Sequence, residues 1–329
     1  MGGQPLIFAF TLWISEGSVM GNSILIYSYA KINLSIDVGE PLPSGMHPVD
    51  MIMHQVSFHD EVKVSLSEGN GKISLETNRR YLPVDSRNIA YKAAELMQSR
   101  FPAKSGSEDI HIAIKKNIPV AAGLAGGSGN GAAVIHALNT MWRLNLSLLE
   151  ILELCAELGS DVPFCAAGQA FSNYVLPKKI RKDSLAFSCA RAKGTGTELS
   201  KAAPLKAFVV FAKPPIGVST KKVYQGIDDV SIDERPNNDI LSAALLSGDR
   251  QTVYSQMINV LENYTLNAEP KVFELKSLME KKLKGAKKVL MSGSGPTVFA
   301  LFDKREEAVS AAKLLRSHGY EAYRCRTTI

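Results

Sequence analysis

The glycines between Pro119 and Ala133 are the first residues of this chain whose spacing suggests a chemical function. The segment reads PVAAGLAGGSGNGAA, with five glycines in nine residues; it follows a predicted strand and runs directly into a predicted helix. Glycine lets a backbone approach an oxyanion closely, and a helix N-terminus offers unpaired N–H donors with a partial positive charge. The pattern therefore predicts a phosphate-binding loop, with a glycine turn that holds no ligand as the alternative.

Two common nucleotide motifs do not fit this segment. No Lys-Ser or Lys-Thr pair follows a G-x-x-x-x-G frame, which excludes a Walker A loop. The spacing G-x-x-G-G-S is also wrong for a dinucleotide-binding fold, and no acidic ribose ligand ends a following strand. We therefore expect a phosphate loop of another class.

The elements that must position this loop follow from the hydrophobic patterns. Alternating apolar and polar residues predict strands, and apolar residues at helical spacing predict helices. The predicted strands are 23–38, 61–66, 72–76, 109–115, 207–212, 287–291, 297–302 and 322–325. The predicted helices are 88–100, 131–143, 148–158, 238–246, 250–261, 271–283 and 305–317. Ser147 and Glu150 have the spacing of a capping box. The fold class is therefore α+β, and the second half has a ferredoxin-like layout.

We expect two domains that share a cleft, one over 20–190 and one over 191–329. Residues 171–190 look like an insertion, for which a solvated basic loop is favoured over a lid or partner surface. Residues 1–19 are expected to be a non-native or disordered extension, or an extra strand, with Met20 as the natural start. Their apolar run is too short to span a bilayer and lacks the preceding basic residues of a signal peptide.

The composition excludes some classes of protein. An apolar content of 45% with 21% charged residues excludes disordered and fibrous proteins. The net charge of +6 suits either a nucleic-acid-binding protein or an enzyme that attracts polyanionic nucleotides. The four cysteines match no metal or redox spacing, so we expect reduced thiols in the cytoplasm. We expect no nucleic-acid or membrane partner, and a monomer or homodimer.

The chain resembles the GHMP kinase superfamily in several ordered blocks. The glycine segment resembles that superfamily's phosphate motif, and SGSGP at 292–296 resembles its C-terminal glycine motif, which packs beside the nucleotide loop. Within the superfamily, the likeness is greatest to kinases of a cytidine diphosphate-linked methylerythritol. The further blocks are YAKINLSIDV (29–38), LGSDVPFCAAGQA (158–170), PPIGVSTKKVY (214–224), RPNND (235–239) and MSGSGPTVFALF (291–302).

This resemblance implies a two-domain GHMP kinase fold, with a ribosomal-protein-S5-like N-terminal domain and a ferredoxin-like C-terminal domain. It implies transfer of a phosphoryl group from ATP, with Mg²⁺, to the substrate's 2-hydroxyl in the non-mevalonate isoprenoid route. Asp161 matches the superfamily's proposed base, and Lys31 matches the lysine beside it. Taken alone, either residue is more typical of an exposed ion pair.

The resemblance also implies a set of nucleotide-binding residues. Ser128 could bind Mg²⁺ or a phosphate oxygen, or could be a helix N-cap, and Asn88 could lie in the adenine pocket or be an N-cap. The implied cofactor-binding residues are Asn88, Pro119, Ala121, Gly123, Leu124, Ala125, Gly126, Gly127, Ser128, Gly129 and Asn130.

For the cytidine end of the substrate, the resemblance implies an aromatic sandwich. Tyr224 supplies one ring, but Met46 stands where the superfamily's turn has a tyrosine, and a thioether offers less contact area. His47 is a candidate for hydrogen bonding to the cytosine edge, with a turn or surface histidine as the alternative. Asn33 and Thr220 are further substrate-side candidates.

Two rival functions remain open on the sequence. One is a GHMP kinase for another alcohol, such as homoserine, mevalonate or a sugar, which Met46 keeps open. The other is a catalytically silent nucleotide- or RNA-binding protein, suggested by the basic pI of about 9.0. The presence of both Lys31 and Asp161 argues against the second.

Overall fold

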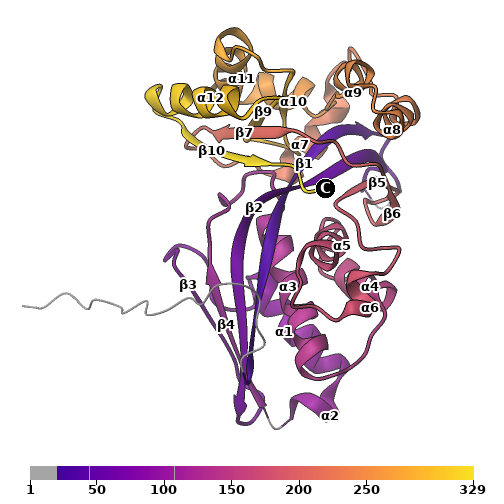
Figure 1. Ribbon diagram of the computed structural model, residues 1–329, viewed down its shortest axis with the longest axis vertical. Helices are drawn as coiled ribbons and strands as arrows, with labels where there is room; N and C mark the ends of the chain where they lie inside the picture. The colour runs from indigo at the N-terminus through magenta and orange to yellow at the C-terminus, as the bar shows by residue number, and fades with distance from the viewer. Residues whose placement is uncertain (1–20, 44, 107) are drawn as a thin grey trace, which may run out of the picture.

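The computed structural model describes residues 21–43, 45–106 and 108–329, and within them two β-sheets carry helices packed against them (Figure 1). The first sheet has the strand order β3-β4-β2-β5-β6 with β1 paired to β2, and the second has the order β10-β7-β9-β8. Among the strands of the described residues, only β3 and β4 are parallel neighbours. The strands are β1 Ser23–Val38, β2 Val49–Glu68, β3 Ile73–Thr77, β4 Glu108–Lys115, β5 Cys189–Lys193, β6 Glu198–Lys201, β7 Phe208–Lys213, β8 Lys288–Met291, β9 Val298–Phe302 and β10 Glu321–Arg326.

The helices of the first half cover one face of the first sheet (Figure 1). Helix α3 packs on β1, β2, α1 and α5, and its apolar residues are buried between the sheet and these helices. Helix α4 begins at the capping box of Ser147 and Glu150, as predicted. These helices are α1 Ile89–Arg100, α2 Pro102–Ser105, α3 Gly126–Met141, α4 Leu148–Ala156, α5 Val162–Ser172 and α6 Lys178–Arg181.

The helices of the second half pack around the second sheet and beside the end of the first (Figure 1). Helix α12 lies against β7, β9 and β10, and α11 lies against β7, β8 and β9. These helices are α7 Thr220–Gly226, the short 3-10 turn Ile227–Asp229, α8 Asn238–Ser247, α9 Arg250–Gln256, α10 Glu262–Ala268, α11 Pro270–Lys282 and α12 Arg305–Ser317.

The long hairpin of β1 and β2 connects the two halves. The Ile36 N–H donates to the Ile258 carbonyl at 2.9 Å, and the Val260 N–H donates to the Ile36 carbonyl at 3.0 Å. On β2, the Gln55 carbonyl accepts from the N–H of Thr328, which follows β10. A buried apolar cluster contains residues of both sheets, including Ile32 and Phe299. The two halves therefore share hydrogen bonds and a core along this hairpin.

The β1–β2 register shifts twice, between Tyr29 and Lys31 and between Asn33 and Ser35. A bulge redirects the side chains next to it, which is why bulges are common beside active sites. Here the two irregularities bracket Lys31 and Asn33. The Lys31 N–H donates to the Leu124 carbonyl at 3.2 Å, so the same stretch also holds the glycine loop.

Most predicted elements are present, and the α+β class is confirmed. Strand β1 and helix α12 have the predicted bounds, but β2 begins at Val49, twelve residues before the predicted start at residue 61. The predicted helix 250–261 ends early, at Gln256. Helix α3 begins at Gly126, inside the predicted loop, because glycines pack it closely against β1 and α1. The prediction missed β5, β6, α2, α5, α6, α7, α10 and the 3-10 turn.

The segment 171–190 is not a solvated loop, which corrects the favoured prediction. Its basic residues lie at the surface or half-buried, but Leu176, Ile180 and Phe187 are almost fully buried beneath them. The division placed at residue 190 falls within β5, which pairs with β2 of the first sheet. The chain passes to the second sheet between Lys201 and Phe208.

The predicted extension 1–19 lies outside the described residues. Within the described ranges, every helix is too short or too polar to cross a bilayer.

Candidate active site

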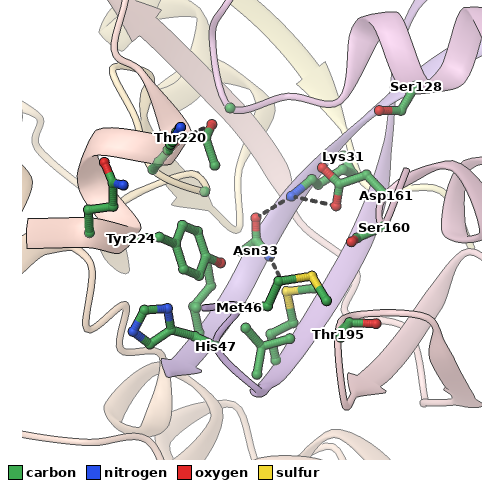
Figure 2. Close-up of a pocket in the computed structure, with 18 of the residues that line it drawn as sticks. Lys31, Asn33, Met46, His47, Ser128, Ser160, Asp161, Thr195, Thr220 and Tyr224 are labelled. Carbon is green, nitrogen blue, oxygen red and sulfur yellow. Dashed lines mark hydrogen bonds and ion pairs between the residues drawn. The ribbon is translucent and has the colours of Figure 1, made fainter. Parts of the chain in front are cut away.

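A cavity of about 560 Å³ opens where the two halves meet. Strand β1 supplies Lys31 and Asn33, the start of α3 supplies Ser128, and α7 supplies Thr220 and Tyr224. Figure 2 shows Lys31, Asp161 and Ser128 at one end and His47 and Tyr224 at the other, with Asn33 and Met46 between them. The structure thus gathers into one cavity the predicted residues Lys31, Asn33, Met46, His47, Gly123, Ser128, Asp161, Thr220 and Tyr224.

Lys31 and Asp161 form an ion pair inside the cavity. The Lys31 ammonium lies 3.5 Å from Asp161 Oδ1 and donates to Asn33 Oδ1 at 2.7 Å. The lysine side chain is 6% exposed and the aspartate side chain is 34% exposed, so the aspartate is the partner that is open to a ligand. Asn33, which is fully buried, therefore holds the ammonium beside a carboxylate that can still contact a substrate hydroxyl.

Asp161 stands just before the first residue of α5, where an aspartate normally accepts hydrogen bonds from the helix's own N–H groups. Its side chain makes no such capping bond, and its backbone is already in the helical region. The carboxylate is directed to Lys31 instead (Figure 2). Asp161 therefore lacks the capping hydrogen bond that would stabilise the helix, and its carboxylate lies in the cavity.

The first turn of α3 offers the donors expected of a phosphate site. Ala125 is the N-cap residue in a left-handed conformation, and the Gly129 N–H donates to its carbonyl at 2.9 Å. The N–H groups of Gly126, Gly127 and Ser128 precede that bond and belong to the orphan donors of a helix start. Because Ala125 occupies the cap position, the alternative prediction of Ser128 as the N-cap is wrong. The Ser128 hydroxyl lines the cavity.

The two glycine turns pack backbone to backbone. A Cβ on Gly123 would overlap the Ser292 carbonyl oxygen, and Gly123 has a φ of +69°. The Ser292 hydroxyl donates to the Gly123 carbonyl at 2.9 Å. Gly293 and Ser294 of the second turn line the same cavity. Gly123 is therefore required for the contact between the two halves at the floor of the site.

Several predicted loop residues face the protein interior instead. Leu124 belongs to the core, and a Cβ on Gly126 or Gly129 would overlap Lys116 or Ser28. These residues can offer a ligand only their backbone. Asn130 is 3% exposed; with its amide nitrogen turned toward acceptors, it lies 3.0 Å from Asp60 Oδ2 and from Ser28 Oγ. Its side chain is therefore engaged inside the protein.

A buried ion pair that sequence reasoning missed lies beneath this loop. Lys116 pairs with Asp60 on β2, and the two side chains are 4% and 0% exposed. Burial lowers the pKa of Lys116, and the Asp60 carboxylate opposes that shift. Asp60 Oδ1 also accepts from the backbone N–H groups of Asn117 and Ile118, at 2.7 and 2.8 Å. Asp60 thus anchors the first residues of the loop to the sheet.

Three further predicted nucleotide residues, which are not part of the first turn of α3, also lie outside the cavity lining. Asn88 is the N-cap of α1, with Oδ1 accepting from the Ala90 N–H at 3.0 Å and Nδ2 donating to the Pro83 carbonyl at 2.9 Å. Pro119 lines a neighbouring hollow of about 420 Å³. Ala121, which is exposed at a φ of +50°, lies next to that hollow along the chain. Of these, only the N-cap alternative for Asn88 is supported by a contact.

At the opposite end of the cavity, the predicted base-binding residues lie together. The ring centroids of His47 and Tyr224 are 6.0 Å apart. Met46 is 54% exposed. Burial raises the pKa of the Tyr224 phenol, and the Asp161 carboxylate raises it further. The Tyr224 phenol is therefore neutral at physiological pH. Thr220 Oγ1 lies 3.0 Å from Ser294 Oγ, which ties α7 to the second glycine turn.

Sequence reasoning missed several residues of the cavity wall. Ser160 adjoins Asp161, and Lys221 adjoins Thr220. Thr195 is in the turn between β5 and β6, two strands that the hydrophobic pattern does not predict. The unpredicted lining side chains with polar groups are Ser160, Thr195, Lys221, Gln225 and Ser294.

The described ranges contain no group of three or more His, Cys, Asp or Glu side chains that could hold a metal ion. Ser128 and Asp161 lie at the same end of the cavity and both present oxygens (Figure 2). A hydroxyl and one carboxylate suit an ion that takes most of its ligands from water and phosphate, which is how Mg²⁺ is commonly held.

Two segments of the chain match families of known proteins. Residues 88–169 match the GHMP kinases N terminal domain, and residues 241–321 match the GHMP kinases C terminal family. These segments contain the glycine loop with Asp161, and the second glycine turn, respectively.

Curated relatives resemble the chain along most of their length. The 4-diphosphocytidyl-2-C-methyl-D-erythritol kinase of Brevibacillus brevis is 41% identical over 294 residues, which cover 89% of this chain and 92% of the relative. The kinase of the same name from Clostridioides difficile is 40% identical over 302 residues, covering 91% and 94%.

Solved structures of similar fold agree with this relationship. A crystal structure of 4-(cytidine 5'-diphospho)-2C-methyl-D-erythritol kinase matches with a TM-score of 0.72 at 25% identity, covering 93% of this chain and 99% of that one. Homoserine kinase from Cytophaga hutchinsonii matches with a TM-score of 0.67 at 18% identity, a likeness that concerns the fold alone.

Proposed function

Because the chain belongs to the 4-diphosphocytidyl-2-C-methyl-D-erythritol kinase family of GHMP kinases, we propose that it transfers the γ-phosphoryl group of ATP to the 2-hydroxyl of that cytidyl compound. This reaction is a step of the non-mevalonate isoprenoid route. We also place the enzyme in the cytoplasm, in keeping with its four free cysteines.

One observation carries the proposal for the mechanism. The Lys31–Asp161 pair lies in the same cavity as the first turn of α3 and the second glycine turn. A kinase for an alcohol needs a group that orients or deprotonates the hydroxyl next to donors that hold the triphosphate. The cavity brings both requirements together.

In the proposed reaction, Asp161 accepts a hydrogen bond from the acceptor hydroxyl and takes its proton as the oxygen bonds to the γ-phosphorus. The bond from that phosphorus to the bridging oxygen of ATP breaks, and ADP leaves. Lys31, held by Asn33, offsets negative charge that develops on the transferred group. Most of the acceleration comes from positioning and electrostatics, as in other phosphoryl transfers.

The triphosphate is assigned to the start of α3 and to the loop before it. The orphan N–H groups of Gly126, Gly127 and Ser128 suit phosphate oxygens. Ser128 is the residue we assign to Mg²⁺, which would neutralise phosphate charge when it is bound. The Asp60–Lys116 pair beneath the loop holds it in place without reaching the cavity.

The other end of the cavity is assigned to the cytidine. Tyr224 and Met46 are the candidates for contact with the faces of the base, and His47 is the candidate for its edge. Asn33 lies between the base end and the phosphoryl end, and Thr220 lines the cavity beside Ser294 of the second glycine turn. The residue types at the two ends of the cavity therefore suit an acceptor that carries a nucleotide at one end and a polyol at the other.

The test compares wild type with Asp161→Asn in a coupled ATP assay. We expect wild type to phosphorylate the cytidyl acceptor and not homoserine or mevalonate. The variant should lose about 10²–10⁴-fold in kcat, the range expected for a positioned general base. Asp183→Asn, a carboxylate in the 171–190 segment outside the cavity, is the matched control and should keep full activity.

Turnover of only homoserine or mevalonate would refute the acceptor assignment. Undiminished activity of Asp161→Asn would remove Asp161 from the mechanism. RNA binding without ATP turnover would favour the non-catalytic rival, and such binding should weaken steeply with salt.

A further inference from the structure

The imidazole of His47 is held by a carboxylate that no motif singled out. His47 Nε2 lies 3.0 Å from Asp228 Oδ1 and 3.2 Å from Asp228 Oδ2. The histidine side chain is 4% exposed and the aspartate side chain is 42% exposed. Asp228 belongs to the 3-10 turn that directly follows α7, the helix that carries Tyr224. The same short segment of chain thus supplies both the Tyr224 ring beside His47 and the Asp228 carboxylate that holds the imidazole.

This contact decides which nitrogen of His47 can accept a hydrogen bond. An ionised carboxylate only accepts, so the single N–H of a neutral imidazole must lie on Nε2 and point to Asp228. Nδ1 then keeps its lone pair, and within the described residues no donor is bonded to it. His47 lines the cavity beside Tyr224, as Figure 2 shows.

The two pyrimidine bases differ at C4, which is the position we assign to contact with Nδ1; at N3, where cytosine accepts and uracil donates, an acceptor would favour uracil instead. Cytosine carries an amino group at C4, which donates, whereas uracil carries a carbonyl oxygen there, which accepts. A nitrogen lone pair attracts the first and repels the second. A histidine free to change tautomer would accommodate either base, because its N–H could move to the nitrogen that faces the ligand.

We propose that Asp228 is a positioning residue for base selection: by holding the N–H of His47 on Nε2, it makes Nδ1 an acceptor that favours a cytidyl over a uridyl acceptor substrate. This inference rests on the proposed function, since it concerns the base end of the same cavity. Asp228 itself touches His47 and does not line the cavity.

The experiment measures kcat/KM for the cytidyl acceptor and for its uridyl analogue in wild type and in Asp228→Asn. The amide of asparagine can donate or accept, so the variant no longer dictates the tautomer. We expect the cytidyl-to-uridyl ratio to fall by roughly fivefold to tenfold, the worth of one neutral hydrogen bond. The change should appear in KM for the acceptor, with KM for ATP unaltered.

Two further variants separate this role from a structural one. Asp229→Asn removes the same charge from the neighbouring exposed position and should keep the wild-type ratio. Asp228→Glu restores a carboxylate and should recover much of the ratio. An equal fall with both acceptors, or an unchanged ratio in Asp228→Asn, would overturn the inference. A wild type that phosphorylates neither acceptor would instead refute the proposed function.

Discussion

Single residues of this site are held by contacts that leave one group free for a ligand. Asp161 does not cap its helix, so its carboxylate stays available to a ligand. The Lys31 ammonium is fixed by Asn33 Oδ1 at 2.7 Å. His47 gives one nitrogen to Asp228 and keeps the other. Fixing a side chain in advance lowers the cost of ordering it when the substrate binds. The reactive end and the base end therefore follow the same physical rule.

Met46 is the residue at which a gain in binding can be predicted. A tyrosine there would add a flat ring that can stack on the base opposite Tyr224. For Met46→Tyr we expect KM for the cytidyl acceptor to fall by about threefold to tenfold, which corresponds to ~0.5–1.5 kcal/mol for one aromatic pair. Steady-state kinetics at saturating ATP would measure it.

Leu42→Tyr is the matched control for this change. Leu42 is 39% exposed, its N–H donates to the Met46 carbonyl, and it does not line the cavity. Its substitution should leave KM for the acceptor unchanged. A KM that rises in Met46→Tyr would mean that the base does not lie between positions 46 and 224.

The sequence predicted which residues meet in the cavity, but not how the deeper ones support them. Lys31, Ser128, Asp161 and Tyr224 lie in motifs that are recognisable singly. The Asp60–Lys116 pair joins positions 56 residues apart, and neither is among the predicted site residues. The β2–β4 register places Glu61 opposite Lys115, and this brings their neighbours Asp60 and Lys116 together. The register between two strands cannot be predicted from the sequence pattern alone.

Among the elements, the two glycine turns matter most because their backbones touch. A Cβ at position 123 would overlap the Ser292 carbonyl and would also be strained at a φ of +69°. In Gly123→Ala, the loop must move away from the second turn, and the donors at the start of α3 lose their alignment. We expect kcat/KM for ATP to fall about 100-fold, as for a loss of positioning near the reacting groups.

Gly248→Ala provides the control for backbone strain. Gly248 has a φ of +76°, and a Cβ there would meet nothing within 4 Å. Both variants should lose stability from the positive φ, measured by thermal unfolding, and Gly123→Ala should lose more because of its overlap with Ser292; only Gly123→Ala should lose activity. Equal activities in the two variants would show that the contact between the turns is dispensable.

Elements with one buried face were predictable, and those buried on both faces were not. Strand β1 alternates over its first residues, and the helical spacing of α12 is clear, so both were placed at their true bounds. The first half of β2, VDMIMHQV, is buried on both faces and shows no alternation. Helix α7 has only seven residues, of which two are buried, too few for a period to appear.

At the scale of the whole molecule, His54 joins the first sheet to the segment that leads into the second. Its Nδ1 donates to the Gln55 carbonyl at 2.8 Å, and its Nε2 accepts from the Leu205 N–H at 3.0 Å. Both bonds require the neutral ring, because a proton on Nε2 would face the Leu205 N–H. Burial accordingly lowers the pKa of His54 from 6.5 to about 4.

This shift predicts how stability depends on pH. Between pH 6.5 and 4 the unfolded chain binds a proton at His54 that the folded protein does not, so the stabilisation is present above pH 6.5 and is lost as the pH falls toward 4. Once the pH is below 4, the free energy of unfolding is lower by about 3 kcal/mol, at 1.36 kcal/mol per pKa unit. Urea unfolding across this range should show a smaller slope in His54→Gln than in wild type.

His318→Gln is the control for the pH series. His318 is exposed near the end of the chain, so its substitution should leave the slope at the wild-type value. If His54→Gln and His318→Gln give the same slope, the acid sensitivity of the protein arises from other groups.

The contact between Gly123 and Ser292 also sets an order of events during synthesis of the protein. The glycine loop and Asp161 leave the ribosome well before the second turn, and domains fold from the N-terminus as they emerge. The first sheet and its helices can therefore assemble on the nascent chain, while the floor of the cavity is absent until residues 292–296 are free to fold back. A chain made only as far as the first half would hold the reactive pair yet lack a complete nucleotide site, so activity requires that the second turn has also been made.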